Sequence, residues 1–294
     1  MNRADALEIH VAYEHCRRLT RRAAKNFYFA FVTLPPDQRR AIYAAYAFAR
    51  LCDDASDEEI DVEQKLRLLR ELRERLALAY EGHPRGPVFT ALADAAKRFN
   101  IPREHFEELT RGVEMDLTVT RYATFDDLRL YCYRVASVVG LICLPIFGCR
   151  DPRAKDAAID LGLAMQITNI LRDVKEDLGR GRIYLPQDEI TRFGYSEAEL
   201  LAGVANDKFL ALMRFQAERA RGYYESAAKG LPLLSARSRA CPSVLGGLYR
   251  RILDRLEARD FNVFEGRVSL SGREKVLLTA RLWISSLLPA SAPR

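Results

Sequence analysis

Residues 162–177 read GLAMQITNILRDVKED, which sets polar side chains at regular intervals into an apolar segment. Five of these side chains follow steps of four, three, four and four residues: Gly162, Gln166, Asn169, Asp173 and Asp177. Those steps place them on one face of an α-helix. The positions beside them are rich in leucine, isoleucine and valine, so the polar face must meet solvent or line a cavity.

A second segment of the same kind, residues 43–57, reads YAAYAFARLCDDASD. Steps of three, four, three and four residues again select one helix face: Tyr43, Tyr46, Arg50, Asp53 and Asp57. Arg50 lies one turn before Asp53, and Asp53 lies one turn before Asp57. The sequence therefore predicts two helices that each end in a cluster of carboxylates beside an arginine.

Such clusters need a compensating charge, because carboxylates one turn apart repel each other by roughly 0.3 kcal/mol in an isolated helix. A bound Mg²⁺ would supply it. This ion prefers oxygen ligands, takes one or two carboxylates per site and completes its shell with water and phosphate oxygens. The alternative is that each Asp-x-x-x-Asp pair is a solvated helix end. Two such pairs, each near an arginine and backed by a polar stripe, favour the metal site.

The composition narrows the class of protein. The chain has 294 residues, of which 49% are hydrophobic and 29% charged, with 16 Gly and 12 Pro; it is neither disordered nor collagen-like. The net charge of +6 permits anionic lipid, phosphorylated substrates or nucleic acid. The positive charge is scattered and accompanies no recognition motif, so we expect no nucleic-acid partner. The six cysteines form no C-x-x-C pair and are predicted to be buried thiols.

The sequence carries no sign of secretion. Its first residues, MNRAD, contain no apolar core of a signal peptide. The longest notable uncharged run, residues 135–149, is shorter than the roughly 20 residues that a spanning helix needs, and it contains Gly140 and Pro145. We therefore expect a cytoplasmic protein with no membrane-spanning segment.

Helical periodicity dominates the chain, and alternating strand patterns are scarce. Pro35 and Pro36 separate the first two helices, since proline suits a first helical turn. Residues 179–194 are predicted to be a loop. The predicted helices cover about 5–31, 36–57, 61–81, 88–99, 103–119, 125–148, 152–178, 197–228, 237–264 and 271–288. With no long Ser/Gly/Pro linker, we predict one all-α domain over 1–294.

Three ordered motifs resemble the squalene/phytoene synthase family, the head-to-head branch of the trans-isoprenyl diphosphate synthases. The first, D-D-x-x-D, is residues 53–57. The second, Q-x-x-N-I-x-R-D-x-x-E-D, is residues 166–177 and continues as R-G-R-x-Y-L-P at 180–186. The third, Y-C-Y-x-V-A-x-x-V-G, is residues 131–140. The resemblance runs from about residue 24 to 265, and the ordered set is far more specific than a bare D-D-x-x-D.

The resemblance implies an isoprenoid-synthase-like helical bundle with a central cavity, in which Mg²⁺ clusters bind two prenyl diphosphates. It implies these metal ligands or near ligands: Asp53, Asp57, Asn169, Asp173 and Asp177. The implied catalytic residues are Asp53, Asp57, Asp173, Asp177, Tyr131 and Arg172. The residues expected to contact substrate are Lys25, Phe27, Phe31, Tyr43, Tyr46, Arg50, Val135, Gly140, Gly162, Gln166, Asn169, Arg182, Tyr184 and Tyr249.

The chain departs from the family pattern in two places. The family often has a serine before the first motif helix, where this chain has Ala24-Lys25-Asn26-Phe27. Lys25 can still donate to a phosphate. In the third motif the family's V-A-G is Val135-Ala136-Ser137, which makes the helix backbone more crowded there.

Three functions remain in competition at this level. The first hypothesis is a prenyltransferase that joins two farnesyl diphosphates through presqualene diphosphate toward squalene or a squalene precursor, as in hopanoid synthesis. NADPH would be needed only if the reaction ends at squalene. The alternative is a phytoene synthase acting on two geranylgeranyl diphosphates, and a non-enzymatic alternative is a silent assembly subunit. For either reaction we expect peripheral association with a membrane surface, because substrates are amphiphilic and products are oils.

The choice of C15 substrate depends on one structural expectation. Tyr43 lies nearly three turns before Asp53, or about 15 Å at 1.5 Å per residue, which is about the reach of a farnesyl tail. Phe31 precedes the Pro35-Pro36 turn and can fold back beside Tyr43. The two rings are predicted to form a floor that accepts C15 chains and rejects C20 chains; the alternative is that both are ordinary core aromatics.

Overall fold

The computed structural model of the protein describes residues 3–24 and 27–287, and side chains from residue 6 onward. Helices dominate this part of the chain, and apart from one isolated bridge between Arg121 and Ile183 it contains no strand pairing. The all-α prediction is therefore confirmed. The long helices are α1 (Arg3–Ala23), α3 (Pro36–Asp57), α4 (Val62–Tyr80), α5 (Pro87–Phe99), α6 (Arg103–Thr118), α9 (Arg153–Gly179), α12 (Asp207–Ala228), α13 (Ala236–Glu257) and α14 (Gly272–Leu287).

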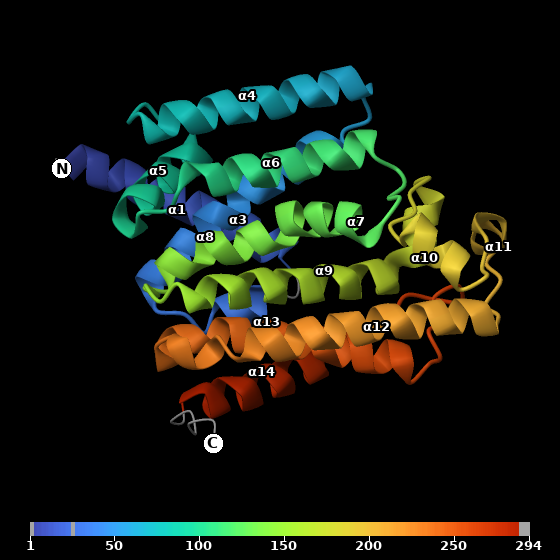
Figure 1. Ribbon diagram of the computed structural model, residues 1–294. Coiled ribbons are helices and arrows are strands. Elements are labelled where there is room, and N and C mark those ends of the chain that lie inside the picture. The colour runs from blue at the N-terminus through green and yellow to red at the C-terminus, as the bar shows by residue number, and fades with distance from the viewer. Residues whose placement is uncertain (1–2, 25–26, 288–294) are drawn as a thin grey trace.

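The shorter elements join these long helices at their ends. They are α2 (Phe27–Phe31), α7 (Phe125–Cys132), α8 (Val138–Ile146), α10 (Gln187–Arg192), α11 (Glu197–Leu201), a π-helical turn η1 (Tyr133–Ser137) and a 3₁₀ turn η2 (Leu231–Leu233). The long helices run roughly side by side, and α9 crosses the middle of the bundle (Figure 1). It packs against η1, α8, α12 and α13, so its polar face is enclosed by other helices.

Local sequence explains most helix ends. Proline occupies the first turn of α3 and α5, where the missing N–H is not needed. The side chain of Asp61 accepts from the backbone N–H of Gln64 at the start of α4. Asn100 ends α5 with φ at 53°, a left-handed conformation that asparagine tolerates. The predicted bounds of these helices are within one residue of those observed.

Several predicted elements differ from the structure, among them the helix expected over 237–264, which ends at Glu257. The helix expected over 5–31 is two helices, α1 and α2, with Ala24 and the undescribed residues 25–26 between them. The loop expected over 179–194 contains α10. The helix expected over 197–228 is divided at 202–206, because Gly203 takes φ of 67° and the Asn206 side chain caps α12 through the N–H of Phe209.

The helix expected over 125–148 is continuous from Phe125 to Ile146 but changes pitch at η1. By length and composition alone these 22 residues could cross a membrane, so the prediction that no segment was long enough is wrong. The prediction considered only residues 135–149 and missed the apolar turns before them. In the fold this helix packs against α6 and α9, as a core helix does.

Close backbone approach holds the π-turn in place. A Cβ on Gly162 of α9 would lie 2.4 Å from the Cα of Ser137, and a Cβ on Gly112 of α6 would lie 2.8 Å from a methyl of Val135. Both positions therefore need glycine for steric reasons. The hydroxyl of Ser137 donates to the carbonyl of Ile159 at 2.7 Å, so this serine adds a bond between η1 and α9.

Candidate active site

The first acidic motif lies at the C-terminal end of α3. Arg50 forms an ion pair with Asp54, whereas Asp53 and Asp57 form none with any residue in 6–24 or 27–287. Asp53 is accessible to solvent, yet surrounding protein raises the pKa of its carboxyl to about 7, and the charges of Asp57, Asp54 and Asp116 add to the effect. Two carboxylates of this motif are therefore left with uncompensated charge.

The second acidic motif lies on α9, and its two aspartates, Asp173 and Asp177, have different electrostatic surroundings. Arg172 contacts both oxygens of Asp173, at 2.7 and 2.5 Å. Arg267, in the segment between α13 and α14, contacts the same two oxygens at 2.9 and 3.1 Å. In contrast, burial and the nearby Asp173 raise the pKa of Asp177 to about 7. Asp173 is thus neutralised by two guanidinium groups while Asp177 is not.

Asp116, near the C-terminal end of α6, lies between the two motifs. Its negative charge contributes to the raised pKa of both Asp53 and Asp177. The hydroxyl of Tyr184 donates to its Oδ1 at 2.7 Å, and the hydroxyl of Tyr131 donates to its Oδ2 at 3.1 Å. Burial raises the pKa of Asp116, which these two hydrogen bonds and Arg182 oppose. The sequence analysis did not predict Asp116 as a site residue, because it is a single carboxylate without a partner at helical spacing.

Tyr131 and Tyr184 belong to a packed cluster of three tyrosines. Their ring centroids are 5.1 Å apart, and Tyr122 lies 5.5 Å from the first and 5.8 Å from the second. All three side chains are buried. The hydroxyl of Tyr122 is buried and has no hydrogen-bond partner within the described part of the chain. This cluster forms an aromatic surface next to the carboxylates.

A second aromatic group lies between α2, α3 and α13. The ring of Phe27 is 6.3 Å from Tyr46 and 6.1 Å from Tyr249. The ring of Phe31 is 6.1 Å from Tyr46 and 6.4 Å from Tyr43, as expected from the turn at Pro35 and Pro36. Tyr249 is buried, which raises the pKa of its hydroxyl, and the charge of Arg172 opposes that shift. The predicted aromatic residues of the site are therefore brought together, and both Phe31 and Tyr43 are buried.

Among the predicted metal ligands, Asn169 has the side-chain environment that best suits a bound cation. Its side-chain nitrogen donates to Oε1 of Gln166 at 3.2 Å, but its Oδ1 is buried and has no partner among the residues that the structure describes. A buried oxygen without a donor is costly, and a hard cation would satisfy it. Across the described ranges no three His, Cys, Asp or Glu side chains lie close enough together to hold a metal. The residues therefore fit Mg²⁺ that arrives with phosphate ligands rather than an all-protein cage.

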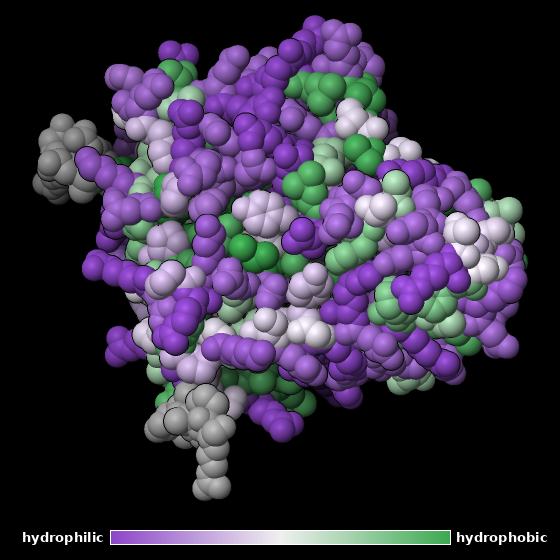
Figure 2. Space-filling model, in the orientation of Figure 1, coloured by the Kyte–Doolittle hydropathy of each residue, from purple (hydrophilic) through white to green (hydrophobic). Residues whose placement is uncertain are grey.

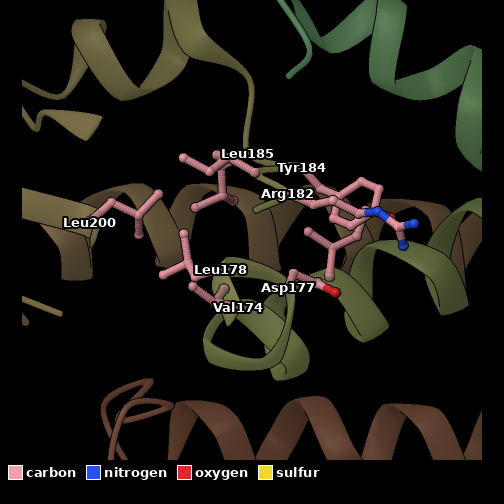
Figure 3. Close-up of a pocket in the computed structure, with 9 residues that line it drawn as sticks. Val174, Asp177, Leu178, Arg182, Tyr184, Leu185 and Leu200 are labelled. Carbon is pink, nitrogen blue, oxygen red and sulfur yellow. The ribbon is translucent and has the colours of Figure 1, made fainter. Parts of the chain in front are cut away.

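A small pocket lies where the end of α9 meets the segment before α10. Asp177, Arg182 and Tyr184 line one side of it, and Val174, Leu178, Leu185 and Leu200 line the other (Figure 3). Its free volume is about 10 Å³, on the order of one water molecule. It is too small for an isoprenoid chain.

The remaining predicted residues have structural contacts or lie outside the described chain. Gly162 and Gly140 face neighbouring backbone, of Ser137 and Ala158 respectively, and Val135 packs against Gly112. These contacts leave their predicted role in substrate binding untested. Lys25 lies outside the described residues. Arg267 is a second residue that the sequence analysis missed, since it comes from a connecting segment without a periodic pattern.

Comparison with known proteins identifies the family. The family model for squalene/phytoene synthase matches residues 20–274. The chain belongs to this family. It is a prenyltransferase, and the resemblance noted from the three motifs is confirmed.

Phytoene synthases are among the curated relatives of this chain. That of Arthrospira platensis is 40% identical over 90% of this chain and 90% of its own length. That of Mycobacterium tuberculosis is 40% identical over 97% of this chain and 96% of its own. A 15-cis-phytoene synthase of Synechococcus elongatus is 40% identical over 87% of each.

Solved structures of the same fold come from squalene-type enzymes. A dehydrosqualene synthase in complex with a ligand superimposes with a TM-score of 0.87, at 32% identity, over 96% of this chain and 98% of its own. A squalene synthase from Alicyclobacillus acidocaldarius superimposes with a TM-score of 0.83, at 29% identity, over 87% of this chain and 97% of its own. These matches confirm the isoprenoid-synthase-like fold.

The prediction of a farnesyl diphosphate substrate and a squalene-type product is wrong in the light of these relatives, which favour the phytoene synthase alternative. Phe31 and Tyr43 do meet, but a contact between two buried rings does not measure the length of the space beside them. The length of isoprenoid chain that an enzyme accepts depends on side chains along the whole tunnel. The spacing of residues in one helix does not predict the position of all of these side chains.

Proposed function

We propose that this protein condenses two molecules of geranylgeranyl diphosphate head to head and forms phytoene. The observation that supports this most is the 40% identity to phytoene synthases over nearly the whole chain. The geometry agrees with a diphosphate substrate, because carboxylates from α3 and α9 converge on Asp116 with arginines beside them. Both acidic motifs are intact, which argues against a silent assembly subunit.

In this proposal the acidic residues hold Mg²⁺ and the arginines hold the diphosphates. The ligands would be Asp53, Asp57, Asn169, Asp173 and Asp177. Bound Mg²⁺ would neutralise the diphosphate and make it a better leaving group. Arg50, Arg172 and Arg182 would add fixed positive charge near the same oxygens, where a partly buried setting strengthens each interaction.

The aromatic side chains would protect the carbocation that diphosphate loss creates. Phe27, Tyr46 and Tyr249 form one aromatic group, and Tyr131 and Tyr184 belong to another; both groups would line the path of the cation. Ring faces stabilise a cation without forming a bond to it, and apolar walls exclude water that would capture it. The hydrogen bonds to Asp116 hold the Tyr131 and Tyr184 hydroxyls in place.

Phytoene formation ends with loss of a proton rather than addition of hydride, so the proposal requires no NADPH. We also place the protein in the cytoplasm, in contact with a membrane surface, because the product is an oil with low solubility in water. This part of the proposal follows from the chemistry of substrate and product.

The test is a product analysis with two substrates. The protein is incubated with Mg²⁺ and either geranylgeranyl or farnesyl diphosphate, with and without NADPH, and the extracted hydrocarbons are identified by mass. We expect a C40 hydrocarbon from the C20 substrate, independent of NADPH. A C30 product formed faster from farnesyl diphosphate would overturn the proposal. Asp53→Ala and Asp173→Ala serve as inactive references in both arms.

A further inference from the structure

Helix α14 closes one edge of the bundle and turns an apolar face outward. In Figure 1 it is the outermost helix at the lower edge, beside α13, and Figure 2 shows hydrophobic side chains along that edge. The exposed hydrophobic residues include Leu277 at 70%, Ile284 at 59% and Trp283 at 44% relative exposure. Trp283 is the single tryptophan of the chain. So large a group of exposed apolar side chains on one helix marks an interaction surface.

The exposed residues form a continuous stripe rather than a scatter. At 100° per residue they fall within about 120° of the helix circumference: Val276, Leu277, Ala280, Trp283, Ile284 and Leu287. We call these six residues the outer stripe. Arg273 lies at its start and Arg281 at its side, and both are exposed.

The inner side of α14 is sufficient to hold the helix. Leu282 packs on Gly247 of α13, where a Cβ would lie 2.3 Å from a leucine methyl. Ser271 and Glu274 form a capping arrangement at the N-terminus, and Arg255 pairs with Glu274. The outer stripe is therefore not needed for folding contacts.

The charges around the outer stripe favour an anionic partner. Glu274 is the acidic residue of α14, and it is already occupied by Arg255 and Ser271. Arg273, Lys275 and Arg281 form no ion pair with a residue that the structure describes. An apolar stripe flanked by unpaired cations, with a tryptophan in it, has the chemistry of a helix that lies in a membrane interface.

A second copy of the chain fits the outer stripe less well. A helix of 16 residues is about 24 Å long and about 10 Å wide, so this face offers about 240 Å² per copy. A stable dimer buries roughly 800 Å² per partner. Pairing two copies would also bring the arginines of both helices together.

We propose that the outer stripe of α14 docks the protein on an anionic lipid bilayer. The inference deepens the proposed function, which supplies an oily product, but the surface is argued from the helix alone. Trp283, Ile284 and Leu277 would enter the headgroup boundary. Arg273 and Arg281 would meet lipid phosphates while their alkyl stems stay against the apolar stripe.

Trp283 provides a direct test. Full-length protein is mixed with vesicles of phosphatidylcholine and phosphatidylglycerol, and with vesicles of phosphatidylcholine alone. On the anionic vesicles we expect a blue shift of tryptophan emission, quenching by lipids brominated near the headgroup, and co-sedimentation that weakens at high salt. Leu277→Glu with Ile284→Glu should lower vesicle binding about tenfold or more, because both charges would have to enter the interface. The control is Leu7→Glu on α1, a residue that is 64% exposed.

The outcomes separate this surface from the proposed function. Activity is measured in detergent micelles, where the double variant should keep wild-type turnover, so a catalytic failure would not imitate a binding failure. Vesicle binding without a change in Trp283 emission would place the contact elsewhere and overturn the inference. If the emission of Trp283 is already blue-shifted in the absence of lipid and light scattering shows dimers, the outer stripe would instead contact a second copy of the chain.

Discussion

Arg267 and Asp173 lie 94 residues apart in the sequence and form a two-point ion pair, with Nε 2.9 Å from Oδ1 and Nη2 3.1 Å from Oδ2. Arg172, which directly precedes Asp173 in the sequence, contacts the same carboxylate. A carboxylate held by two guanidinium groups has no free oxygen lone pair in a favourable direction for a cation. Metal binding at Asp173 therefore requires at least one arginine to move, and a substrate diphosphate offers that arginine a new partner.

Arg267→Ala should separate two roles of this arginine: competition with Mg²⁺ for Asp173, and attraction of the substrate diphosphate. Loss of one competing guanidinium should lower the Mg²⁺ concentration needed for half-maximal activity. Loss of a cation near the diphosphate should lower kcat/KM at saturating Mg²⁺ by about tenfold to a hundredfold, or roughly 1.4–2.7 kcal/mol. Steady-state kinetics at several Mg²⁺ concentrations measures both. The control is Arg214→Ala, which removes an exposed arginine paired with Asp260 at 3.3 Å and should change neither value more than twofold.

The raised pKa of Asp53 predicts a pH-dependent stability of the metal-free protein. Because the pKa of this carboxyl is about 7 in the folded state and near 3.9 when unfolded, the folded state binds the extra proton between these values. The contribution of this carboxyl to stability should therefore be greatest below about pH 4 and be lost as the pH rises through 7. Asp53→Asn should flatten this profile and raise Tm at pH 8, measured by circular dichroism with EDTA present.

Asp126→Asn on α7 is the control, because this exposed carboxylate is not among the charges that raise the pKa of Asp53. Its removal should leave the slope of Tm against pH unchanged. A pH profile that Asp53→Asn leaves as steep as in the wild type would contradict the assignment.

Much of the fold could be read from the sequence because its helix ends carry strong local signals. Pro35 and Pro36 fixed the start of α3, and the run of carboxylates fixed its end at Asp57. The break between α1 and α2 has no proline or glycine, so periodicity continued through it. The division at 202–206 depends on the cap by Asn206, a weak signal inside an otherwise helical pattern.

The site was predicted in part for the same reason. Residues at helical spacing, such as Asp53 and Asp177, could be recognised as a face. Asp116 and Arg267 act through contacts made only in three dimensions, with Tyr184 and with Asp173. Substrate length could not be predicted from any single residue, because it depends on the summed shape of a tunnel; the relatives favour the phytoene synthase alternative.

Asp116→Ala should affect both acidic motifs at once. The carboxylate raises the pKa of Asp53 and of Asp177, so its loss should lower both pKa values. The acidic limb of the kcat/KM profile should then move to lower pH. The buried hydroxyls of Tyr131 and Tyr184 would lose their acceptor, which should cost about 1–3 kcal/mol of stability. Tyr184→Phe removes one of these hydrogen bonds but keeps the charge, so it should leave the acidic limb in place.

Gly162→Ala tests whether the contact between α9 and η1 is as close as the backbone indicates. The new Cβ would lie 2.4 Å from the Cα of Ser137 and 2.5 Å from its nitrogen, and backbone atoms cannot rotate away as a side chain can. We expect a loss of about 1–3 kcal/mol in the free energy of unfolding from overpacking, measured by urea denaturation. Gly222→Ala is the control, because Gly222 also lies inside a long helix, α12, but a Cβ there meets nothing within 4 Å. That variant should gain up to about 1 kcal/mol from the helix propensity of alanine. If both variants gained stability alike, α9 and η1 would have room to separate, and the steric account of Gly162 would fail.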